Sequence, residues 1–320
     1  MTGENILRKI SDMKYIEVFE KYVKALDEKG FKDAKSDVLL LIYEVFDFGE
    51  RMVEKDLNRQ PTIEIKRGKN VLFDFDFSKW TMFKYDEIKD IKKLDIIESY
   101  VAKRLENMPI QYILNKAYFC GLPFFVNENV LIPRFDTEVL VEEVLKLADG
   151  DKSKRILDMC TGSGAIAIAL KSLGGFEKVD ALDISDNALE VAKKNAQSLS
   201  CDINFLKSDM FSGLTSENKY DIIVSNPPYI KSHVVDSLES EVKDFEPRLA
   251  LDGDIDGMKF YKIIRDEFIK YLNPEGILAL EIGYDEAADI KALFEGFDVS
   301  IKKDLANLDR VAVISKNKLA

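Results

Sequence analysis

The first part of the chain shows mainly the periodicity of amphipathic helices. Apolar residues recur every three or four positions in three segments, at residues 16–23, 37–46 and 88–105. This spacing places them on one face of a helix. Apolar and polar residues alternate instead in residues 62–77, around a polar turn, which predicts a β-hairpin. We therefore expect residues 1–112 to form a mainly helical N-terminal domain.

A second alternating segment joins this domain to the rest of the chain. Residues 117–132 contain Gly121 and Pro123 and end at Pro133. Glycine and proline are the usual turn residues between short strands. We expect a second β-hairpin here, within a linker that covers residues 113–134.

From about residue 135 onward, strand patterns and helix patterns alternate. The expected strands are residues 155–160, 179–184, 203–206, 220–225, 277–282, 297–301 and 311–315. The expected helices are residues 137–148, 165–171, 187–197 and 258–272, and one that begins at Asp285. Such alternation implies a largely parallel sheet that is covered on both faces. The fold class is therefore α/β, with the main domain over residues 135–320.

The charge balance argues against a nucleic-acid partner. The chain has 46 lysines and arginines against 58 aspartates and glutamates, a formal net charge of −12. Binding to a duplex depends on neutralising phosphates and usually shows as a basic face. We therefore expect no direct contact with nucleic acid, and favour a protein or a small molecule as the partner.

Cysteine and histidine are too sparse for a metal site. The three cysteines are far apart and the chain has one histidine, His233, so a zinc site is not expected. An odd number of isolated cysteines is typical of a reducing compartment. No segment approaches the roughly 20 apolar residues of a membrane span. We expect a cytoplasmic protein that does not bind membranes.

A glycine-rich turn follows the first strand of the α/β part. Residues 155–170 combine an apolar strand, the turn Thr161-Gly162-Ser163-Gly164 and a helix of small residues. Glycine lets the backbone approach a ligand without interference from a Cβ atom. Asp183 ends the next strand, 21 residues after Gly162, where a carboxylate can accept hydrogen bonds from ribose hydroxyls. These residues fit S-adenosylmethionine and a dinucleotide about equally well.

The third strand of this part ends near an acid and an apolar residue. Asp209 and Met210 lie in residues 207–211, the segment that follows this strand. An acid and an apolar side chain at this edge can hold the amino group and the ring of adenine. They extend the candidate nucleotide site.

The fourth strand runs directly into Asn226-Pro227-Pro228-Tyr229. Ligands bind at the carboxyl ends of strands in an open α/β sheet. The two prolines lack N–H donors, so the backbone offers only acceptors, and the side-chain oxygen of Asn226 adds another. Tyr229 offers a flat face for stacking. Such a group suits a planar NH2, whose two N–H bonds point at acceptors.

This chemistry favours a methyltransferase over a dehydrogenase. An amide nitrogen is a poor nucleophile, so orientation against a methyl donor is the main catalytic lever, worth roughly 7–11 kcal/mol. The acceptors also stabilise positive charge that grows on the nitrogen. We call residues 226–229, which offer only hydrogen-bond acceptors and a flat ring, the clamp. An NAD-dependent oxidoreductase has no use for such a group.

The motifs taken together resemble those of the release-factor glutamine methyltransferase family (PrmC, also called HemK). The matching segments are MPIQYIL, LIPRFDTEVLVE, LDMCTGSGAIAIAL, SNPPYI, FEPRLALDGDIDG, LALEIGYDE and KDLANLDRVAVI, in order over about residues 108–315. The resemblance implies a Rossmann-like class I methyltransferase sheet and S-adenosylmethionine as the cofactor. It also implies methyl transfer to the glutamine nitrogen (N5) in the Gly-Gly-Gln motif of class I peptide-chain release factors. The N-terminal domain would recognise that substrate.

Carried over position by position, the resemblance assigns site residues. The cofactor would contact Cys160, Thr161, Gly162, Ser163, Gly164, Asp183, Met210 and Asn226. The substrate glutamine would lie on Asn226, Pro227, Pro228 and Tyr229, with Thr137 and Glu138 lining the pocket. Asn226, Pro227 and Tyr229 would be the catalytic residues. Cys160 stands where the family usually has glycine.

Two other methyltransferase substrates share this chemistry. One is a glutamine of a ribosomal protein, which only the N-terminal region would distinguish. The other is adenine in nucleic acid, held by the same clamp after base flipping; it predicts a basic groove that the net charge of −12 does not indicate.

Overall fold

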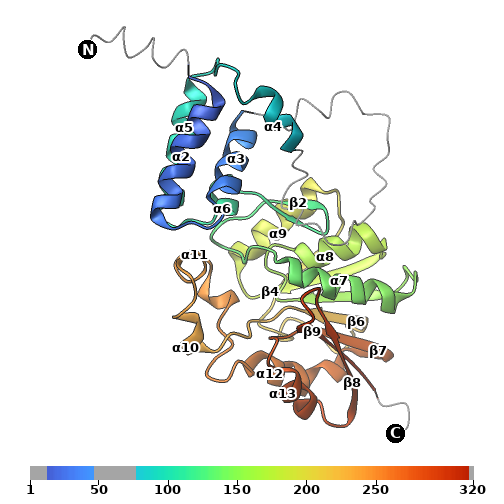
Figure 1. The fold of residues 1–320 in the computed structure, drawn as a ribbon. Coiled ribbons are helices and arrows are strands. Elements are labelled where there is room, and N and C mark those ends of the chain that lie inside the picture. The colour runs from blue at the N-terminus through green and yellow to red at the C-terminus, as the bar shows by residue number, and fades with distance from the viewer. Residues whose placement is uncertain (1–12, 47–76, 317–320) are drawn as a thin grey trace. The chain divides into compact units, whose positions relative to one another are not determined.

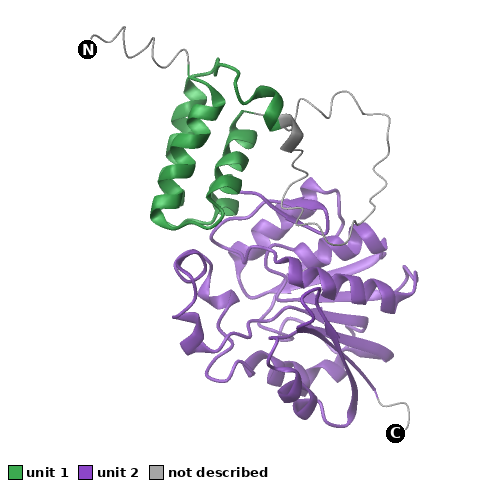
Figure 2. Ribbon diagram, viewed as in Figure 1, with its two compact units in different colours: residues 1–114 green, residues 115–320 purple. Residues whose placement is uncertain are grey.

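The computed structural model describes residues 13–46 and 77–316, and the chain divides into two compact units (Figure 2). Unit 1 covers residues 1–114 and unit 2 covers residues 115–320. Almost all of the hairpin expected at residues 62–77 lies outside the described residues. Phe77 itself begins helix α4 (Phe77–Phe83).

Unit 1 is a group of helices around one buried cluster. The three helices expected from periodicity are α2 (Tyr15–Lys29), α3 (Ala34–Val45) and α5 (Lys92–Leu105). Leu26, Ile42 and Ile97, one from each, are fully buried in the shared cluster. The short helices α4 and α6 (Ile110–Leu114) were not expected, because five to seven residues give too few turns for a periodic pattern.

Unit 2 opens with the expected linker hairpin. Strands β1 (Ala117–Phe119) and β2 (Leu122–Phe124) pair in antiparallel fashion. Cys120 and Gly121 form the turn, with φ of 50° and 75°. A two-residue hairpin turn of this kind requires positive φ at both positions. A hairpin is therefore present with Gly121 in its turn, but it covers residues 117–124 of the expected 117–132, and Pro123 lies in β2 and not in the turn.

A seven-stranded sheet forms the body of unit 2, in the order β5-β4-β3-β6-β7-β9-β8 (Figure 1). The strands are β3 (Arg155–Met159), β4 (Lys178–Asp183), β5 (Asn204–Lys207), β6 (Tyr220–Ser225), β7 (Leu272–Glu281), β8 (Phe297–Lys303) and β9 (Asp309–Lys316). The first five in sheet order are parallel, and β9 is antiparallel to both of its neighbours. The expectation of a largely parallel α/β sheet is confirmed.

Helices pack on both faces of this sheet. Helices α12 (Lys259–Glu267) and α13 (Ala287–Leu293) share a buried cluster with Leu157 and Met159 of β3. Side chains alternate across a strand, so Asp158 points to the opposite face, toward the start of α8 (Ala165–Ala169). Helices α7 (Phe135–Ala148) and α9 (Asp186–Ser198) also contact the α8 region.

Some boundaries differ from the sequence-based expectation. Strand β7 begins at Leu272, five residues before the expected start, because Leu272 already pairs with Tyr220 of β6. The helix expected over 258–272 ends at Glu267 and is followed by the 3-10 turn η4 (Phe268–Lys270). Three short helices between β6 and α12 were missed: α10 (Ser232–Val235), α11 (Ser240–Lys243) and η3 (Arg248–Ala250).

The strand order brings the sequence motifs together at one edge. The carboxyl ends of β4, β3 and β6 are neighbours, because the chain adds β4 and β5 on one side of β3 and then crosses back to place β6 on its other side. Ligands of open α/β sheets bind at such a switch point. In the part of the chain that the structure describes, no helix is both long enough and apolar enough to cross a membrane.

Candidate active site

The turn after β3 is fixed from beneath by Asp158. This side chain is fully buried, and its Oδ2 accepts hydrogen bonds from Thr161 Oγ1 at 2.6 Å and from the Ala167 N–H at 3.1 Å. Burial raises the pKa of the Asp158 carboxyl to about 7, although these two bonds lower it. The bonds tie the turn to the first turn of α8. Its shape is therefore set within nine residues of chain.

Gly162 and Gly164 serve different purposes in this turn. Gly162 has φ of 54°, and no described heavy atom lies within 4 Å of the place where a Cβ would stand. A Cβ on Gly164 would instead lie 3.1 Å from the Cβ of Ala192 on α9 and 3.1 Å from Ile168. Gly162 thus leaves open space for a ligand, whereas Gly164 allows close helix packing.

Asp183 ends β4 beside this turn. Its Oδ2 accepts from the Gly162 N–H and its Oδ1 from the Ser185 N–H, both at 2.9 Å. Burial raises the pKa of the carboxyl, and these N–H groups lower it. An ionised carboxylate has about four acceptor sites. The two oxygens can therefore still accept hydrogen bonds from a ribose.

Two side-chain sulfur atoms lie close together, one from the turn after β3 and one from the segment after β5. The Sγ of Cys160 is 3.9 Å from the Sδ of Met210. Both residues have positive φ, 59° for Cys160 and 48° for Met210, an uncommon conformation for residues other than glycine. Met210 is buried and Asp209 is exposed. This pair offers an apolar surface beside a carboxylate, as the sequence suggested for an adenine.

The Asn-Pro-Pro-Tyr segment begins where β6 ends. Pro227 and Pro228 are buried, while Asn226 and Tyr229 are half-buried. The Asn226 Nδ2 donates to Thr137 Oγ1 at 3.3 Å. The Tyr229 hydroxyl donates to Glu281 Oε1 at 3.2 Å. Both functional side chains are thus held by residues far away in the sequence.

A loop between β6 and α12 braces the backbone of Tyr229. The Ile230 N–H donates to the Leu251 carbonyl, and the Gly253 N–H donates to the Ile230 carbonyl. A Cβ on Gly253 would lie 2.7 Å from the Tyr229 Cα, and one on Gly257 would lie 2.5 Å from the Tyr229 carbonyl oxygen. Only glycine fits at these two positions. Their place in the site was not predicted, although the segment FEPRLALDGDIDG was noted as a family motif.

A cavity of about 310 Å³ joins these elements. Seven of the predicted site residues line it: Cys160, Gly162, Asp183, Asp209, Met210, Asn226 and Pro228. Sequence reasoning missed the other lining residues. Some lie close in sequence to the predicted ones: Met159, Leu182, Ile184, Ser185, Ala188 and Ser208. Three groups lie elsewhere in the chain: residues 129–131, Pro247, Leu249 and Ala250 before the bracing loop, and Lys259, Phe260 and Ile263 on α12. Residues 131, 247, 249 and 250 lie in segments noted only for the family resemblance, and residues 259–263 in a segment expected to be an ordinary helix, so the fold was needed to place them at the cavity.

The other predicted residues lie around the cavity or behind it. Thr161 and Ser163 are buried within the turn, where Thr161 bonds Asp158 and the Ser163 carbonyl accepts from Asn195. Thr137 is buried behind Asn226. The Glu138 Oε1 accepts from the Cys120 N–H at 2.7 Å and so ties the linker hairpin to α7. Roles for these residues in binding stay predictions.

The lining chemistry fits S-adenosylmethionine. Gly162 gives open space, Asp183 gives acceptors for hydroxyls, and Met210 gives an apolar wall. Asp183 and Asp209 place carboxylates in the cavity, which suits a cationic sulfonium better than a pyrophosphate. The lining lysine, Lys259, lies 3.6 Å from the carboxylate of Asp254. The fold and this site define an S-adenosylmethionine-dependent methyltransferase.

Comparison with known proteins narrows this class. Residues 134–254 match the family model "Methyltransferase small domain". The chain is 40% identical over 256 residues to the release factor glutamine methyltransferase of Fusobacterium nucleatum, covering 79% of this chain and 70% of that protein. It is 40% identical over 226 residues to the enzyme of the same name from Clostridium acetobutylicum (69% of this chain, 79% of that protein). The chain belongs to the release factor glutamine methyltransferase family.

Proposed function

We propose that this enzyme transfers a methyl group from S-adenosylmethionine to the side-chain amide nitrogen of the glutamine in the Gly-Gly-Gln motif of class I release factors. The observation that supports this most strongly is the position of Asn226, which lines the cavity at the end of β6. Its Nδ2 already donates a hydrogen bond to Thr137. Its Oδ1 therefore remains as an acceptor for a planar NH2 group.

The clamp residues act by holding the substrate amide. The Asn226 Oδ1 and the Pro227 carbonyl accept its two N–H bonds, and Tyr229 supplies a flat face against its plane. S-adenosylmethionine, when bound, supplies an electrophilic methyl group. As the nitrogen forms its bond to the methyl carbon, the bond from that carbon to the sulfonium sulfur breaks and its electron pair stays on sulfur. The nitrogen becomes positive, and the two acceptors stabilise this charge. The methylated amide then loses its proton to water.

Substrate recognition forms a second part of the proposal. Residues 1–112 are assigned to recognition of the release factor, residues 113–134 to the linker and residues 135–320 to catalysis. The separate buried cluster of unit 1 supports an independent role for it. The free cysteines Cys120, Cys160 and Cys201 support an enzyme that works in the reducing cytoplasm. The acidic net charge of −12 supports a protein substrate over nucleic acid.

A labelling assay tests the chemistry and the substrate together. The purified enzyme is incubated with methyl-labelled S-adenosylmethionine and a class I release factor, with a Gly-Gly-Ala version of the same factor as the control. We expect label on the first factor and none on the second. Equal label on both would show that another residue is modified. Label on ribosomal protein or nucleic acid, with none on the factor, would overturn the substrate assignment.

A further inference from the structure

Glu281 is a buried acid directly behind the clamp. It ends β7, beside the end of β6, and is 2% exposed. It does not belong to the described lining of the cavity. Burial of a carboxylate is costly unless the group is paired and hydrogen-bonded. Any role of Glu281 must therefore explain why a hydrogen-bond acceptor is buried directly behind the clamp.

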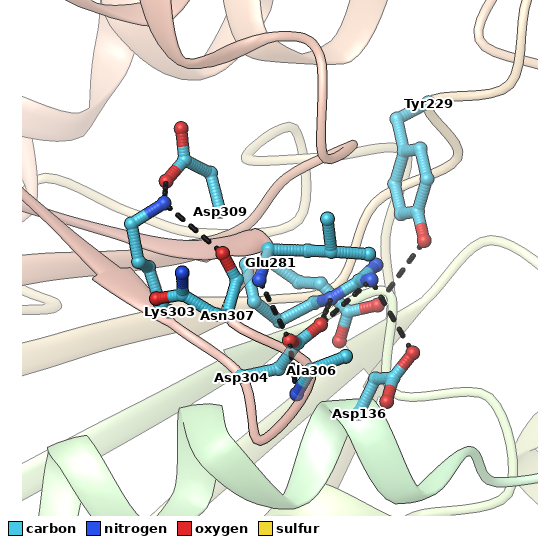
Figure 3. A network of polar contacts seen from close by, with 10 residues as sticks. Asp136, Tyr229, Glu281, Lys303, Asp304, Ala306, Asn307 and Asp309 are labelled. Carbon is cyan, nitrogen blue, oxygen red and sulfur yellow. Dashed lines mark hydrogen bonds and ion pairs between the residues drawn. The ribbon is translucent and has the colours of Figure 1, made fainter.

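The groups around Glu281 come from separate segments of the chain (Figure 3). Tyr229 donates its hydroxyl to Oε1 at 3.2 Å, and hydrogen bonding from Thr137 on α7 also favours the charged form. Arg310 on β9 favours it as well, and is itself held by Asp304 at 3.1 Å and Asp136 at 3.3 Å. Burial raises the pKa of the Tyr229 hydroxyl, so Tyr229 remains a donor.

The direction of each hydrogen bond follows from these partners. A carboxylate only accepts, and Thr137 lowers the pKa of the Glu281 carboxyl as a hydrogen-bond donor does, which requires the single hydrogen of its hydroxyl to face Glu281. The Thr137 oxygen is then an acceptor, and it receives the Asn226 Nδ2 at 3.3 Å. A reversed Asn226 amide would set its oxygen against the Thr137 oxygen, with no hydrogen between them. The series therefore leaves the Asn226 oxygen free for the substrate.

We infer that Glu281 is a positioning residue: through the Thr137 hydroxyl it fixes which end of the Asn226 amide faces the substrate, and through the Tyr229 hydroxyl it holds the ring. The inference rests on the proposed amide clamp. It explains why a sheet strand ends in a buried acid that the cavity does not use. It also gives Thr137 a defined part, behind the clamp.

The protonation state of Glu281 provides a readout. Burial raises the pKa of its carboxyl to about 7. The charged groups that act on it are Arg310 from β9, which is paired with Asp304, and Asp136 from α7. The Tyr261 hydroxyl donates to the Glu281 carbonyl and to the carboxylate of Glu286. As the pH falls through about 7, Glu281 gains a proton and competes as a donor. We expect kcat to fall on the acid side for this reason.

The test compares Thr137→Val, Thr137→Ser and Glu281→Gln with wild type on the labelled release-factor assay. Thr137→Val keeps the shape and loses the hydroxyl, so kcat should fall by roughly 10–100-fold, the size expected for a misplaced group. The KM for S-adenosylmethionine should stay within about twofold, since the cofactor end is untouched. Thr137→Ser should restore most of the loss. Glu281→Gln should lower kcat and remove the acid limb near pH 7.

Asp180→Asn is the matched control. Asp180 also accepts a tyrosine hydroxyl, that of Tyr220 at 2.7 Å, and lies 3.5 Å from Arg155 in the same sheet, away from the clamp. In Asp180→Asn, kcat and its pH profile should stay as in wild type. Wild-type turnover in both Thr137→Val and Glu281→Gln would overturn the inference and leave the proposed function intact.

A second measurement does not need turnover. The side-chain NH2 signals of Asn226 in 15N-labelled protein report the bond to Thr137. We expect Thr137→Val to shift them and to speed their exchange with solvent, and Thr137→Ser to leave them close to wild type. Unchanged NH2 signals in Thr137→Val would overturn the inference. A failure of the wild-type enzyme to label a release factor would refute only the proposed function, so the two failures can be told apart.

Discussion

Each end of the site rests on one buried carboxyl, Asp158 beneath the cofactor turn and Glu281 beneath the clamp. Burial raises the pKa of both to about 7. Each also has one oxygen, Asp158 Oδ1 and Glu281 Oε2, without a hydrogen-bond partner among the described residues. The two acids differ in where their partners come from.

The partners of Asp158 are local, whereas those of Glu281 are scattered. Thr161 and Ala167 lie three and nine residues after Asp158. The groups around Glu281 lie on α7, on β9 and after β6. A turn held by its own neighbours can form with a short loop closure, whereas the clamp exists only when the sheet is complete. We therefore expect substitutions elsewhere in unit 2 to disturb the cofactor turn less than they disturb the clamp.

The strongest separation of the two ends is expected from Asn226→Ala. It removes the acceptor that orients the substrate amide, and should lower kcat by at least about 10²–10³-fold, the size seen when one preorganised polar group is lost. Affinity for S-adenosylmethionine should change by less than about tenfold, or roughly 1.4 kcal/mol. Single-turnover labelling and calorimetric titration measure the two quantities. Full turnover in this variant would refute the clamp.

The bracing loop offers the next largest effect, through Gly257→Ala. The added Cβ would meet the Tyr229 carbonyl oxygen at 2.5 Å and must displace the clamp backbone, so kcat should fall by roughly 10²-fold. Gly150→Ala is the control, because Gly150 has nearly the same φ, 76° against 77°, and no described atom within 4 Å of its Cβ position. Both variants should share a strain penalty of about 1–2 kcal/mol. Equal kcat values would show that the loop does not position Tyr229.

A substitution at the cofactor end should do the opposite: it should lower the affinity for S-adenosylmethionine and leave kcat unchanged. Asp183→Ala removes the proposed ribose acceptor and the partner of the Gly162 N–H, and should weaken S-adenosylmethionine binding by about 1–3 kcal/mol. At saturating cofactor, kcat should stay close to wild type because the clamp is untouched. Asp186→Ala, an exposed acid three residues further on, is the control. Unchanged affinity would place the ribose elsewhere.

The same difference explains what the sequence could predict. The cofactor turn, Asp183 and the Asn-Pro-Pro-Tyr segment are contiguous motifs at strand ends, and the cavity brings residues from each together. The paired strands and the long amphipathic helices were also predicted, because their patterns are local. Boundaries went wrong where pairing overrode the local signal, as for β7, which begins at Leu272.

The supports that act over long sequence separations were not predicted, although Glu281, Gly253 and Gly257 lie in segments noted for the family resemblance. Glu281 reads as the end of an apolar strand, and its contact with Tyr229 spans 52 positions. Gly253 and Gly257 read as turn glycines, and their approach to Tyr229 is visible only in the fold. Thr137 and Glu138 were placed in the substrate pocket by resemblance alone, whereas their contacts lie with Asn226 and with the linker hairpin.

The two buried acids can finally be separated by the pH dependence of stability. Their pKa values in the folded protein, about 7, lie above the ordinary values of 3.8 for Asp and 4.5 for Glu. Folding therefore favours the protonated form, so the contribution of these two groups to stability is complete below their ordinary pKa values and is lost as the pH rises through about 7. One such group contributes a slope of at most about 1.4 kcal/mol per pH unit.

Urea unfolding at pH 6 and pH 8 measures this slope. These two groups should make the free energy of unfolding of wild type larger at pH 6 than at pH 8. Asp158→Asn and Glu281→Gln should each make the difference between the two pH values smaller. Asp202→Asn, at an exposed position, should not. Only Glu281→Gln should also remove the acid limb of kcat, since the hydrogen bonds of Asp158 go to Thr161 and Ala167 in the cofactor turn and not to the clamp. Loss of that limb in Asp158→Asn would mean that the two ends are coupled through β3 and β6, and that the clamp senses the charge beneath the cofactor turn.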